Sequence, residues 1–297
     1  MDIIIFGGSG FVGQHLAKYL ENKGHQVWIA SRKEQQVRFG KNVMYTPEQI
    51  LSLFENMNNE YSVINLAGQS INSGRWTAER KREILQSRVN LTQYIVKAII
   101  EVNRKPLSLI NASAIGFYGY SDEVSFTEQD KKGKGFLADV TQQWEETANQ
   151  AKDDTRVVLA RLGVVLGRDG GALPRMILPY TFFVGGKVGT GNQWLSWVHI
   201  EDVCRILHFC IEQDTISGPV NVTSPAPERM DRFGQVLGHV MQKPHWIPVP
   251  SFMLRLLLGE MSEIVLQGHP VLPEKMLSNG YSYKHPTLSS ALKDLLK

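Results

Sequence analysis

Short apolar runs alternate with segments of helical periodicity through the first two-thirds of the chain. The apolar runs predict strands at residues 2–6, 26–31, 43–46, 61–67, 107–112 and 155–166. The segments between them predict helices at residues 11–23, 47–58, 77–102 and 136–152. Such alternation is typical of a parallel sheet with helices on both faces, and stretches such as VINLA and VVLA are typical of strands buried on both sides. We therefore expect an α/β fold with a Rossmann-type doubly wound parallel sheet.

The alternation loosens after Gly167, where glycine and proline become frequent. Helices are predicted at 202–213 and 229–241, and a short strand at 220–223. We expect a Rossmann domain at 1–166, with later segments woven into it, and a smaller C-terminal substrate lobe at 167–297 that includes a small C-terminal domain at 244–297. In that last part Trp246, Phe252 and Met253 are candidates for docking a partner or a lipid, but we expect them to pack onto their own domain.

The composition narrows the function without changing this fold. The chain has 297 residues, 42% of them hydrophobic, and a formal net charge of +3. Because the positive and negative charges are nearly balanced, the net charge does not indicate nucleic acid as a partner. The start of the chain is unlike a signal peptide, and no apolar run reaches the roughly 20 residues of a membrane span. We therefore expect a cytoplasmic protein with no membrane partner.

The two cysteines, Cys204 and Cys210, are expected to be packing residues. On a helix their spacing would hold them too far apart for a disulfide. They also lack metal-ligand spacing, so we expect no metal site.

Three glycines with the spacing G-x-x-G-x-x-G follow the first predicted strand: Gly7, Gly10 and Gly13. A preceding strand and a following helix are the context in which such a motif binds a dinucleotide. The first glycine permits a tight turn, the second lets a pyrophosphate approach the backbone, and the third lets helix and strand pack closely. Phe11 and Val12 then present N–H groups at the positive end of the helix dipole, where phosphates bind. A plain strand-to-helix turn is the alternative.

The end of the second predicted strand indicates which dinucleotide binds. An acidic residue there would hydrogen-bond a ribose 2′-hydroxyl and repel a 2′-phosphate. Here Ser31, Arg32 and Lys33 offer a hydroxyl and two cations, and the first carboxylate is Glu34. Because a guanidinium binds phosphate by paired hydrogen bonds, we expect NADP(H) rather than NAD(H). Ordinary surface charge is the alternative.

The chain resembles the short-chain dehydrogenase/reductase superfamily in its extended, epimerase-like branch, where G-x-x-G-x-x-G is usual. Further matches follow in order: NLAG at 65–68, NASAIGFYG at 111–119, FTE at 126–128, RLGVVLG at 161–167 and WVHIEDV at 197–203. The resemblance implies that Leu66, Ala67 and Gly68 lie against the adenine and ribose side of the cofactor. It also places Ser113 in the active-site serine position.

A narrower resemblance covers nearly the whole chain. It rests on four segments: NLAGQSINSGRWTAERKREILQSRV, GGALPRMILPY, GTGNQWLSWVHIEDV and VPSFMLRLLLGEMSEIVLQGHPVLPEKM. These are similar to one family of NAD-dependent epimerase-like proteins with a C-terminal domain of unassigned function. Some members carry the label of cell-division inhibitor, and neither that label nor "epimerase" implies a known reaction.

Enzymes of this superfamily usually pair the serine with Y-x-x-x-K. The lysine lowers the tyrosine pKa, so that the tyrosine exchanges a proton with the substrate. This pair is missing after Ser113. If Glu145 closes the usual helix motif, the tyrosine and lysine slots fall on Leu137 and Thr141, and neither side chain does acid–base work.

Tyr118 and His199 are then the candidate proton donors. Tyr118 lies near Ser113 in the sequence, and a histidine titrates near neutrality, although a hydrogen-bonded core histidine is the commoner role. Two functions follow. One is an atypical NADP(H)-dependent oxidoreductase or epimerase acting on an unknown small molecule. The other is a sensor or regulator that binds the dinucleotide without turnover, with a link to cell division. The sequence leaves both open, and it does not separate a monomer from a homodimer.

Three further residues are candidates for substrate contact. Arg75 and Trp76 lie in a loop at the carboxyl edge of the predicted sheet, where ligands bind in such folds. Arg161 is the third, although a buried arginine at a strand centre is expected to need an ion-pair partner. The basic run at 80–82 is expected to be a solvated helix face.

Overall fold

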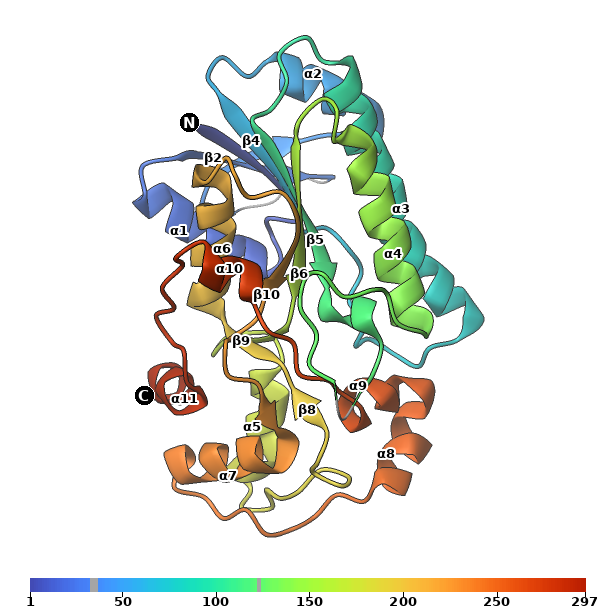
Figure 1. Ribbon diagram of the computed structural model, residues 1–297, viewed down its shortest axis with the longest axis vertical. Coiled ribbons are helices and arrows are strands. Elements are labelled where there is room, and N and C mark those ends of the chain that lie inside the picture. The colour runs from blue at the N-terminus through green and yellow to red at the C-terminus, as the bar shows by residue number, and fades with distance from the viewer. Residues whose placement is uncertain (33–36, 122–123) are drawn as a thin grey trace.

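A seven-stranded parallel sheet forms the centre of the molecule, and its strand order is β10-β6-β5-β4-β1-β2-β3 (Figure 1). The computed structural model describes residues 1–32, 37–121 and 124–297. The strands are β1 (Asp2–Phe6), β2 (Gln26–Ser31), β3 (Lys41–Met44), β4 (Tyr61–Asn65), β5 (Ser108–Ala114), β6 (Arg156–Leu162) and β10 (Gly218–Val222). All neighbouring pairs run parallel, so the predicted doubly wound α/β fold is confirmed.

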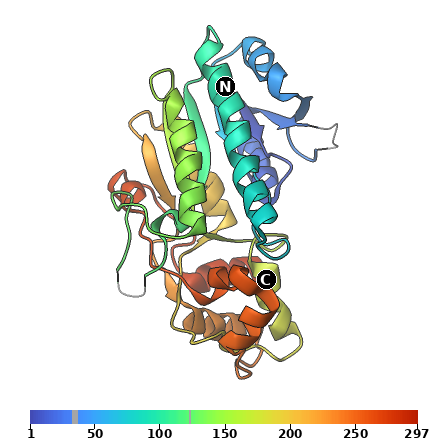
Figure 2. The same cartoon turned by 90° about the vertical axis from the view of Figure 1, so that its right-hand side faces the viewer.

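Helices cover both faces of this sheet (Figures 1 and 2). One face carries α1 (Phe11–Asn22) and α6 (Ile200–Glu212). The other carries α2 (Ile50–Glu55), α3 (Ala78–Glu101) and α4 (Phe136–Ala148). Short 3₁₀ turns lie beside these helices at η1 (Pro47–Gln49), η2 (Ile115–Tyr118) and η3 (Asn149–Ala151).

The sheet separates two apolar cores, as β1 illustrates. Ile3 and Ile5 belong to the core beneath α1 and α6, whereas Ile4 and Phe6 belong to the core beneath α2 and α3. All four side chains have no exposed surface, because alternate residues of a strand point to opposite faces. Each such side chain contributes about 1.5–3 kcal/mol of burial free energy. This double burial is why β1 has no polar alternation in its sequence.

Most predicted boundaries agree with the structure, but two segments differ. The helix expected at 47–58 begins as the 3₁₀ turn η1 and becomes α-helical only at Ile50. The strand expected at 155–166 is interrupted at Gly163, and the short strand β7 (Val164–Leu166) pairs with β9 (Trp197–His199) instead. A Cβ on Gly163 would lie 2.6 Å from the carbonyl oxygen of Ser196, so only glycine allows the chain to leave the sheet here.

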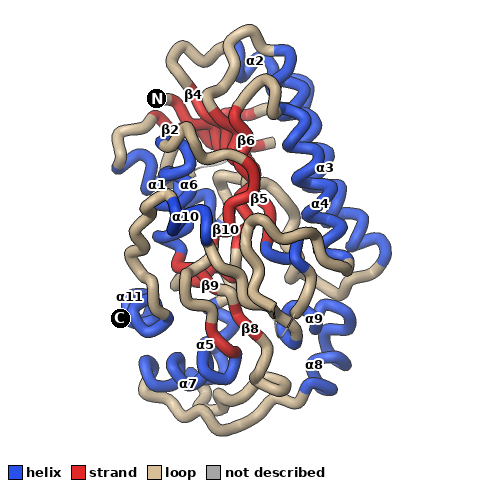
Figure 3. The backbone as a smooth tube through the Cα atoms, viewed as in Figure 1, coloured by secondary structure: helices blue, strands red, loops and turns tan. Residues whose placement is uncertain are grey.

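The second part of the chain forms a lobe of helices and loops beside the carboxyl edge of the sheet (Figure 3). A third apolar core of the protein lies in this lobe. It surrounds Trp197 and is enclosed by α5 (Leu173–Thr181), α7 (Met230–Met241) and α11 (Leu288–Leu296). The other elements of the lobe are β8 (Trp194–Leu195), β11 (Glu228–Arg229), α8 (Ser251–Leu258), η4 (Gly259–Ser262) and α9 (Glu263–Leu266). After them, α10 (Glu274–Ser278) returns to the sheet, where Met276 packs in the core beneath α6. In the described part of the chain, no helix has both the length and the apolar character needed to cross a bilayer.

Two aromatic side chains and one methionine of this lobe differ from the expectation that they pack onto their own domain. Trp246, Phe252 and Met253 are 67%, 69% and 45% exposed, so their own domain leaves much of their apolar surface uncovered. The two cysteines behave as expected: Cys204 and Cys210 are both buried in the core beneath α6, as free thiols.

Candidate functional site: the carboxyl edge of the sheet

The glycine turn brings three segments of backbone into direct contact. Gly7 has φ +78°, a left-handed conformation, and a Cβ there would lie 2.8 Å from the backbone of Leu66 and Ala67. A Cβ on Gly13 would lie 2.5 Å from the carbonyl oxygen of Gly7. Glycine is therefore required at both positions. The contact also places the NLAG segment directly against the turn, where the resemblance locates part of the cofactor.

The start of α1 offers unpaired backbone donors. Gly10 is the N-cap and provides no side-chain hydrogen bond, and the first turn contains no acidic residue. The first backbone bond along the helix runs from the N–H of Gln14 to the carbonyl of Gly10. Helix geometry thus leaves the N–H groups of Phe11, Val12 and Gly13 available for an anion at the positive end of the dipole. These residues fit the pyrophosphate of a dinucleotide.

A loop of the second lobe covers the start of α1. A Cβ on Gly167 or on Gly170 would lie 2.3 Å from the ring of Phe11, so the ring is packed on glycine backbone. Nearby, His15 Nε2 lies 2.9 Å from Asp169 Oδ1. The sequence pattern did not predict that this loop covers the start of α1. Its only local signal is the glycine-rich run GRDGG at 167–171.

The end of β2 carries one exposed cation and one engaged hydroxyl. Arg32 is exposed, as a phosphate ligand would need to be. Ser31 is buried, and its hydroxyl donates to Asn42 Oδ1 at 2.7 Å, so Arg32 is the more accessible of the two residues for a phosphate. Asn42, on β3, was not identified from the sequence. Lys33 lies outside the described residues.

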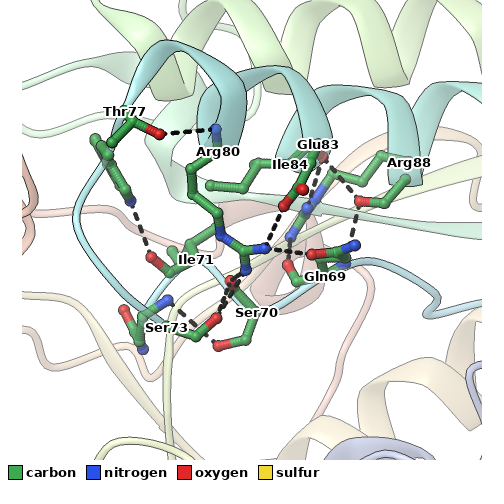
Figure 4. A network of polar contacts seen from close by, with 12 residues as sticks. Gln69, Ser70, Ile71, Ser73, Thr77, Arg80, Glu83, Ile84 and Arg88 are labelled. Atoms are coloured by element: carbon green, nitrogen blue, oxygen red, sulfur yellow. Dashed lines mark hydrogen bonds and ion pairs between the residues drawn. The ribbon is translucent and has the colours of Figure 1, made fainter.

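Two arginines of α3 hold the loop that follows Gly68 (Figure 4). Arg80 donates to the side chain of Gln69, to the carbonyl of Ser70 at 2.6 Å and to Ser73 Oγ at 2.7 Å. Arg88 donates to the carbonyl of Gln69 at 3.0 Å, and burial lowers its pKa to about 10. Arg80 is therefore a loop anchor, which corrects the expectation of a solvated helix face.

Arg75 and Trp76, at the end of this loop, have different surroundings. Trp76 is 7% exposed, donates to the carbonyl of Ile71 at 2.9 Å and packs in a small apolar cluster with Ile84 and Val140. It therefore belongs to a core cluster rather than to an open mouth. Arg75 is exposed and donates to the carbonyl of Leu256 at 2.8 Å, at the end of α8.

Ser113 lies at the carboxyl end of β5 within a buried polar network. Its hydroxyl donates to Glu145 Oε1 at 2.6 Å. Arg161 donates to both oxygens of the same carboxylate at 2.8 Å, and a third N–H of this guanidinium donates to the hydroxyl of Tyr118 at 2.8 Å. Tyr118 in turn donates to Asn221 Oδ1 on β10 at 2.7 Å. The expected ion-pair partner of Arg161 is thus Glu145, which α4 supplies.

Tyr118 is held on every side. It is 2% exposed and stacks on Phe126 with ring centroids 5.2 Å apart. Burial raises its pKa to about 12, although the guanidinium of Arg161 opposes this rise. At neutral pH the phenol is neutral and hydrogen-bonded, unlike the activated tyrosine of a Y-x-x-x-K pair.

The helix that would carry the missing catalytic pair is α4. Leu137 packs against the backbone of Gly116, where a Cβ would lie 3.1 Å from the Leu137 Cβ. The hydroxyl of Thr141 donates to the carbonyls of Leu137 and Ala138 at 2.8 and 3.0 Å. Thr141 therefore bonds its own helix.

His199 belongs to a different cluster, on the side of the C-terminal segment. Its Nδ1 accepts a hydrogen bond from the N–H of Glu201 at 3.0 Å and caps α6, while its ring stacks on His285 at 3.9 Å. Ligand atoms of His199, Glu201 and His285 lie within 4.8 Å of one another, as in a metal site. However, a neutral imidazole that accepts at Nδ1 carries its hydrogen at Nε2, so it has no lone pair left for a metal while it caps the helix.

A histidine that the sequence did not single out lies beside Tyr118. His269 is 4% exposed and donates from Nε2 to the carbonyl of Ile115 at 3.0 Å. Burial lowers its pKa to about 4, so it is neutral at physiological pH. A lone histidine on the coil after α9 gives no sequence signal for this position.

Comparison with known proteins identifies the family of each part of the chain. The sequence model described as the NAD dependent epimerase/dehydratase family matches residues 3–223. That of a domain of unknown function, DUF1731, matches residues 249–295. Epimerase family protein YfhF of Bacillus subtilis is 42% identical over 306 residues, which cover 100% of this chain and 98% of that protein.

Solved structures agree with this assignment. Human epimerase family protein SDR39U1 (isoform 2), crystallised with NADPH, is 30% identical, has a TM-score of 0.91 and covers 99% of both chains. UDP-glucose 4-epimerase of Thermotoga maritima is 16% identical, has a TM-score of 0.81 and covers 99% of this chain and 97% of its own. The second likeness concerns the fold alone.

Proposed function

The chain belongs to the NAD-dependent epimerase/dehydratase family, and we propose that it binds NADP(H) and acts as an oxidoreductase or epimerase on a small molecule. The observation that carries this proposal is the turn at Gly7, Gly10 and Gly13, which presents unpaired N–H groups of α1 beside a backbone cradle that a Cβ would fill. When bound, NADP(H) supplies reversible hydride transfer.

The preference for NADP(H) over NAD(H) rests on Arg32. Its exposed guanidinium lies at the end of β2. The described residues there, Ser31 and Arg32, include no acidic residue that would repel a 2′-phosphate. The NADPH bound to the human relative supports the same choice.

Isothermal titration with both nucleotides tests this preference. We expect wild type to bind NADPH about 10- to 100-fold more tightly than NADH, because hydrogen bonds to a charged group contribute about 1.5–3 kcal/mol. Arg32→Ala should remove the difference. Lys41→Ala, which removes an exposed cation from the neighbouring strand β3, should preserve it. Equal affinities in wild type would refute the assignment.

For the reaction, we propose that Ser113 orients the substrate at the carboxyl end of β5. Its hydroxyl donates to Glu145, which Arg161 holds in turn, so the lone pairs of Ser113 Oγ have a defined direction and would accept a hydrogen bond from a hydroxyl group of the substrate. Of the two proton-donor candidates, Tyr118 is tied to Arg161 and Asn221, and His199 caps α6. These contacts favour structural roles for both and leave solvent or the substrate itself as the proton source.

Binding without turnover is the second candidate function, and Leu137 and Thr141 favour it. Neither side chain exchanges a proton with a ligand, and Thr141 bonds its own helix. The two functions differ in one measurement, the loss of NADPH absorbance with a panel of carbonyl compounds. An enzyme should consume NADPH, and Ser113→Ala should slow that consumption. A sensor should bind NADPH tightly and consume none.

A further inference from the structure

Large apolar side chains gather on the surface of the C-terminal lobe. They come from two segments, the end of α5 with its following loop, and the stretch from residue 246 through α8. We call them the apolar face: Leu178, Phe182, Phe183, Val184, Trp246, Ile247, Phe252, Met253, Leu256 and Leu257, each between 39% and 73% exposed. Single exposed apolar residues are ordinary, whereas a group of this size marks an interaction surface.

Backbone contacts hold the two segments side by side. The N–H of Trp246 donates to the carbonyl of Gly185 at 2.8 Å, and its indole donates to the carbonyl of Phe183 at 2.7 Å. The N–H of Val249 donates to the carbonyl of Lys187 at 2.8 Å, and α8 begins two residues later at Ser251. The face therefore belongs to one structural unit, at the end of the molecule opposite to α2 (Figure 1).

The α8 helix shows most clearly that something should cover this face. None of its eight residues is buried, and six of them are Phe, Met or Leu. Phe252 and Leu256 are 69% and 73% exposed. A helix that is apolar on most of its circumference is ordinarily buried in protein or lipid. At about 12 Å, α8 is too short to span a bilayer, so it would lie in a surface rather than cross it.

The two segments that carry the face contain charges of one sign. Residues 170–200 and 242–259 contain no Asp or Glu, and they contain four Lys or Arg residues: Arg175, Lys187, Lys243 and Arg255. The ammonium of Lys243 lies 3.6 Å from the ring centroid of Phe183, so charge and apolar surface are directly adjacent. The carboxylates that flank these two ranges along the chain are already paired: Asp169 with His15, Glu201 with Lys284, Asp231 with His245 and Glu260 with Lys81.

We propose that the apolar face docks this protein on an anionic lipid surface. Aromatic and aliphatic side chains enter the boundary between headgroups and acyl chains, while the four cations meet lipid phosphates. A second copy of the chain fits less well, because a two-fold contact would bring the same cations of both copies together without a carboxylate to meet them. No residue of the glycine turn belongs to this face, so the proposal stands independently of cofactor binding, and it replaces the sequence-based expectation of no membrane partner.

Flotation of the full chain with lipid vesicles tests the proposal. Wild type should bind vesicles of phosphatidylcholine mixed with phosphatidylglycerol, and bind vesicles of phosphatidylcholine alone at least about tenfold more weakly, since each nearby cation contributes about fivefold. Leu256→Glu should reduce binding to the mixed vesicles by more than about tenfold, because it removes buried apolar area and adds a repelled charge. Since Leu256 is 73% exposed, this variant leaves the core intact.

Two controls make the outcome decisive. Ile100→Glu introduces the same charge at an apolar residue of α3 that is 46% exposed, and it should bind mixed vesicles like wild type. The double variant Lys243→Gln/Arg255→Gln should lose the preference for anionic lipid. Failure of wild type to bind mixed vesicles would overturn the proposal, and so would equal loss in Ile100→Glu. A concentration-dependent dimer in sedimentation equilibrium that Leu256→Glu abolishes, without vesicle binding by wild type, would assign the face to a second copy.

Discussion

The turn at residues 7–13 and the centre around Ser113 lie at the same carboxyl edge of the sheet, but they treat their polar groups differently. Among the described residues, no acceptor is bonded to the N–H groups of Phe11, Val12 and Gly13, which lie beside a cradle formed by backbone. Around Ser113, the side chains of Glu145, Arg161 and Tyr118 are bonded to one another or to other protein groups. The turn thus offers backbone donors to a ligand, whereas the network around Ser113 spends most of its polar groups within the protein.

This difference explains how the chain can have the features of a cofactor site without a recognisable proton donor for a reaction. A pyrophosphate needs only backbone donors and space, which three glycines provide without any catalytic side chain. A reaction needs a proton donor with a tuned pKa, and Tyr118 is instead a buried phenol with its pKa raised to about 12. Variants that act on one region and spare the other can test the separation.

The largest effect is expected from breaking the buried ion pair with Arg161→Met. Glu145 would keep its buried charge without its partner, which typically costs about 3–5 kcal/mol of unfolding free energy. Urea denaturation measures this loss. The double variant Arg161→Met/Glu145→Met should recover most of it, because well-packed apolar residues often replace a buried pair without loss. An unchanged stability in Arg161→Met would mean that the network does not hold this region together.

On the other side of the comparison, Gly10→Leu should abolish nucleotide binding with little effect on stability. Gly10 has φ −76°, and a Cβ there would approach nothing closer than the Gly7 carbonyl oxygen at 3.3 Å, so a side chain requires only a small shift of that carbonyl. The added bulk fills the approach to the N–H groups of α1. Affinity for NADPH in isothermal titration should fall at least about 100-fold, or about 3 kcal/mol. Affinity close to that of wild type would remove the turn from the cofactor site.

The same contrast governs what the sequence could predict. The glycine turn is local: a strand, three glycines and a helix lie within residues 2–22, and Gly7 and Gly13 are required by close backbone contacts that the spacing expresses. The Ser113 network is not local. Its members come from β5, η2, α4, β6 and β10, and the bond from Tyr118 to Asn221 spans 103 residues. Of these residues, only Arg161 was expected from the sequence to have a partner inside the protein, because a charge within an apolar strand needs one.

Failures of prediction have the same origin. Arg80 and Trp76 have the sequence context of a helix surface and a ligand loop, yet the first anchors that loop and the second packs in a core cluster. Phe252 and its neighbours have the composition of a core helix, yet they are exposed. In each case the deciding contact, or its lack, depends on tertiary structure that a local pattern does not contain.

A pH-dependent effect is expected where His269 flanks the Ser113 centre. Burial lowers its pKa from 6.5 to about 4, so the unfolded chain takes up a proton as pH falls through 6.5 and the folded chain does not until about pH 4. Stability that is present above pH 6.5 is therefore lost towards pH 4, by about 2–3 kcal/mol at pH 4.5.

His269→Gln keeps a donor for the carbonyl of Ile115 and removes the titrating group. Urea denaturation at pH 7 and pH 4.5 should therefore show a smaller loss for this variant than for wild type. His239→Gln, on the exposed side of α7, is the matched control. The same pH dependence in wild type and His269→Gln would show that the burial of His269 is not its source.

The smallest effect is expected from Ser113→Ala, and it is the sharpest test of the separation between the two regions. The change removes one hydrogen bond to the Glu145 carboxylate, which still accepts two bonds from Arg161, so the loss in unfolding free energy should be about 1–2 kcal/mol. Since the donors for the pyrophosphate are backbone groups of α1, affinity for NADPH should stay within about twofold of wild type, less than 0.5 kcal/mol. A tenfold loss of affinity would place Ser113 within the cofactor site. The turn and the buried network would then be parts of one site, and binding of the nucleotide would depend on the residues that fix Ser113.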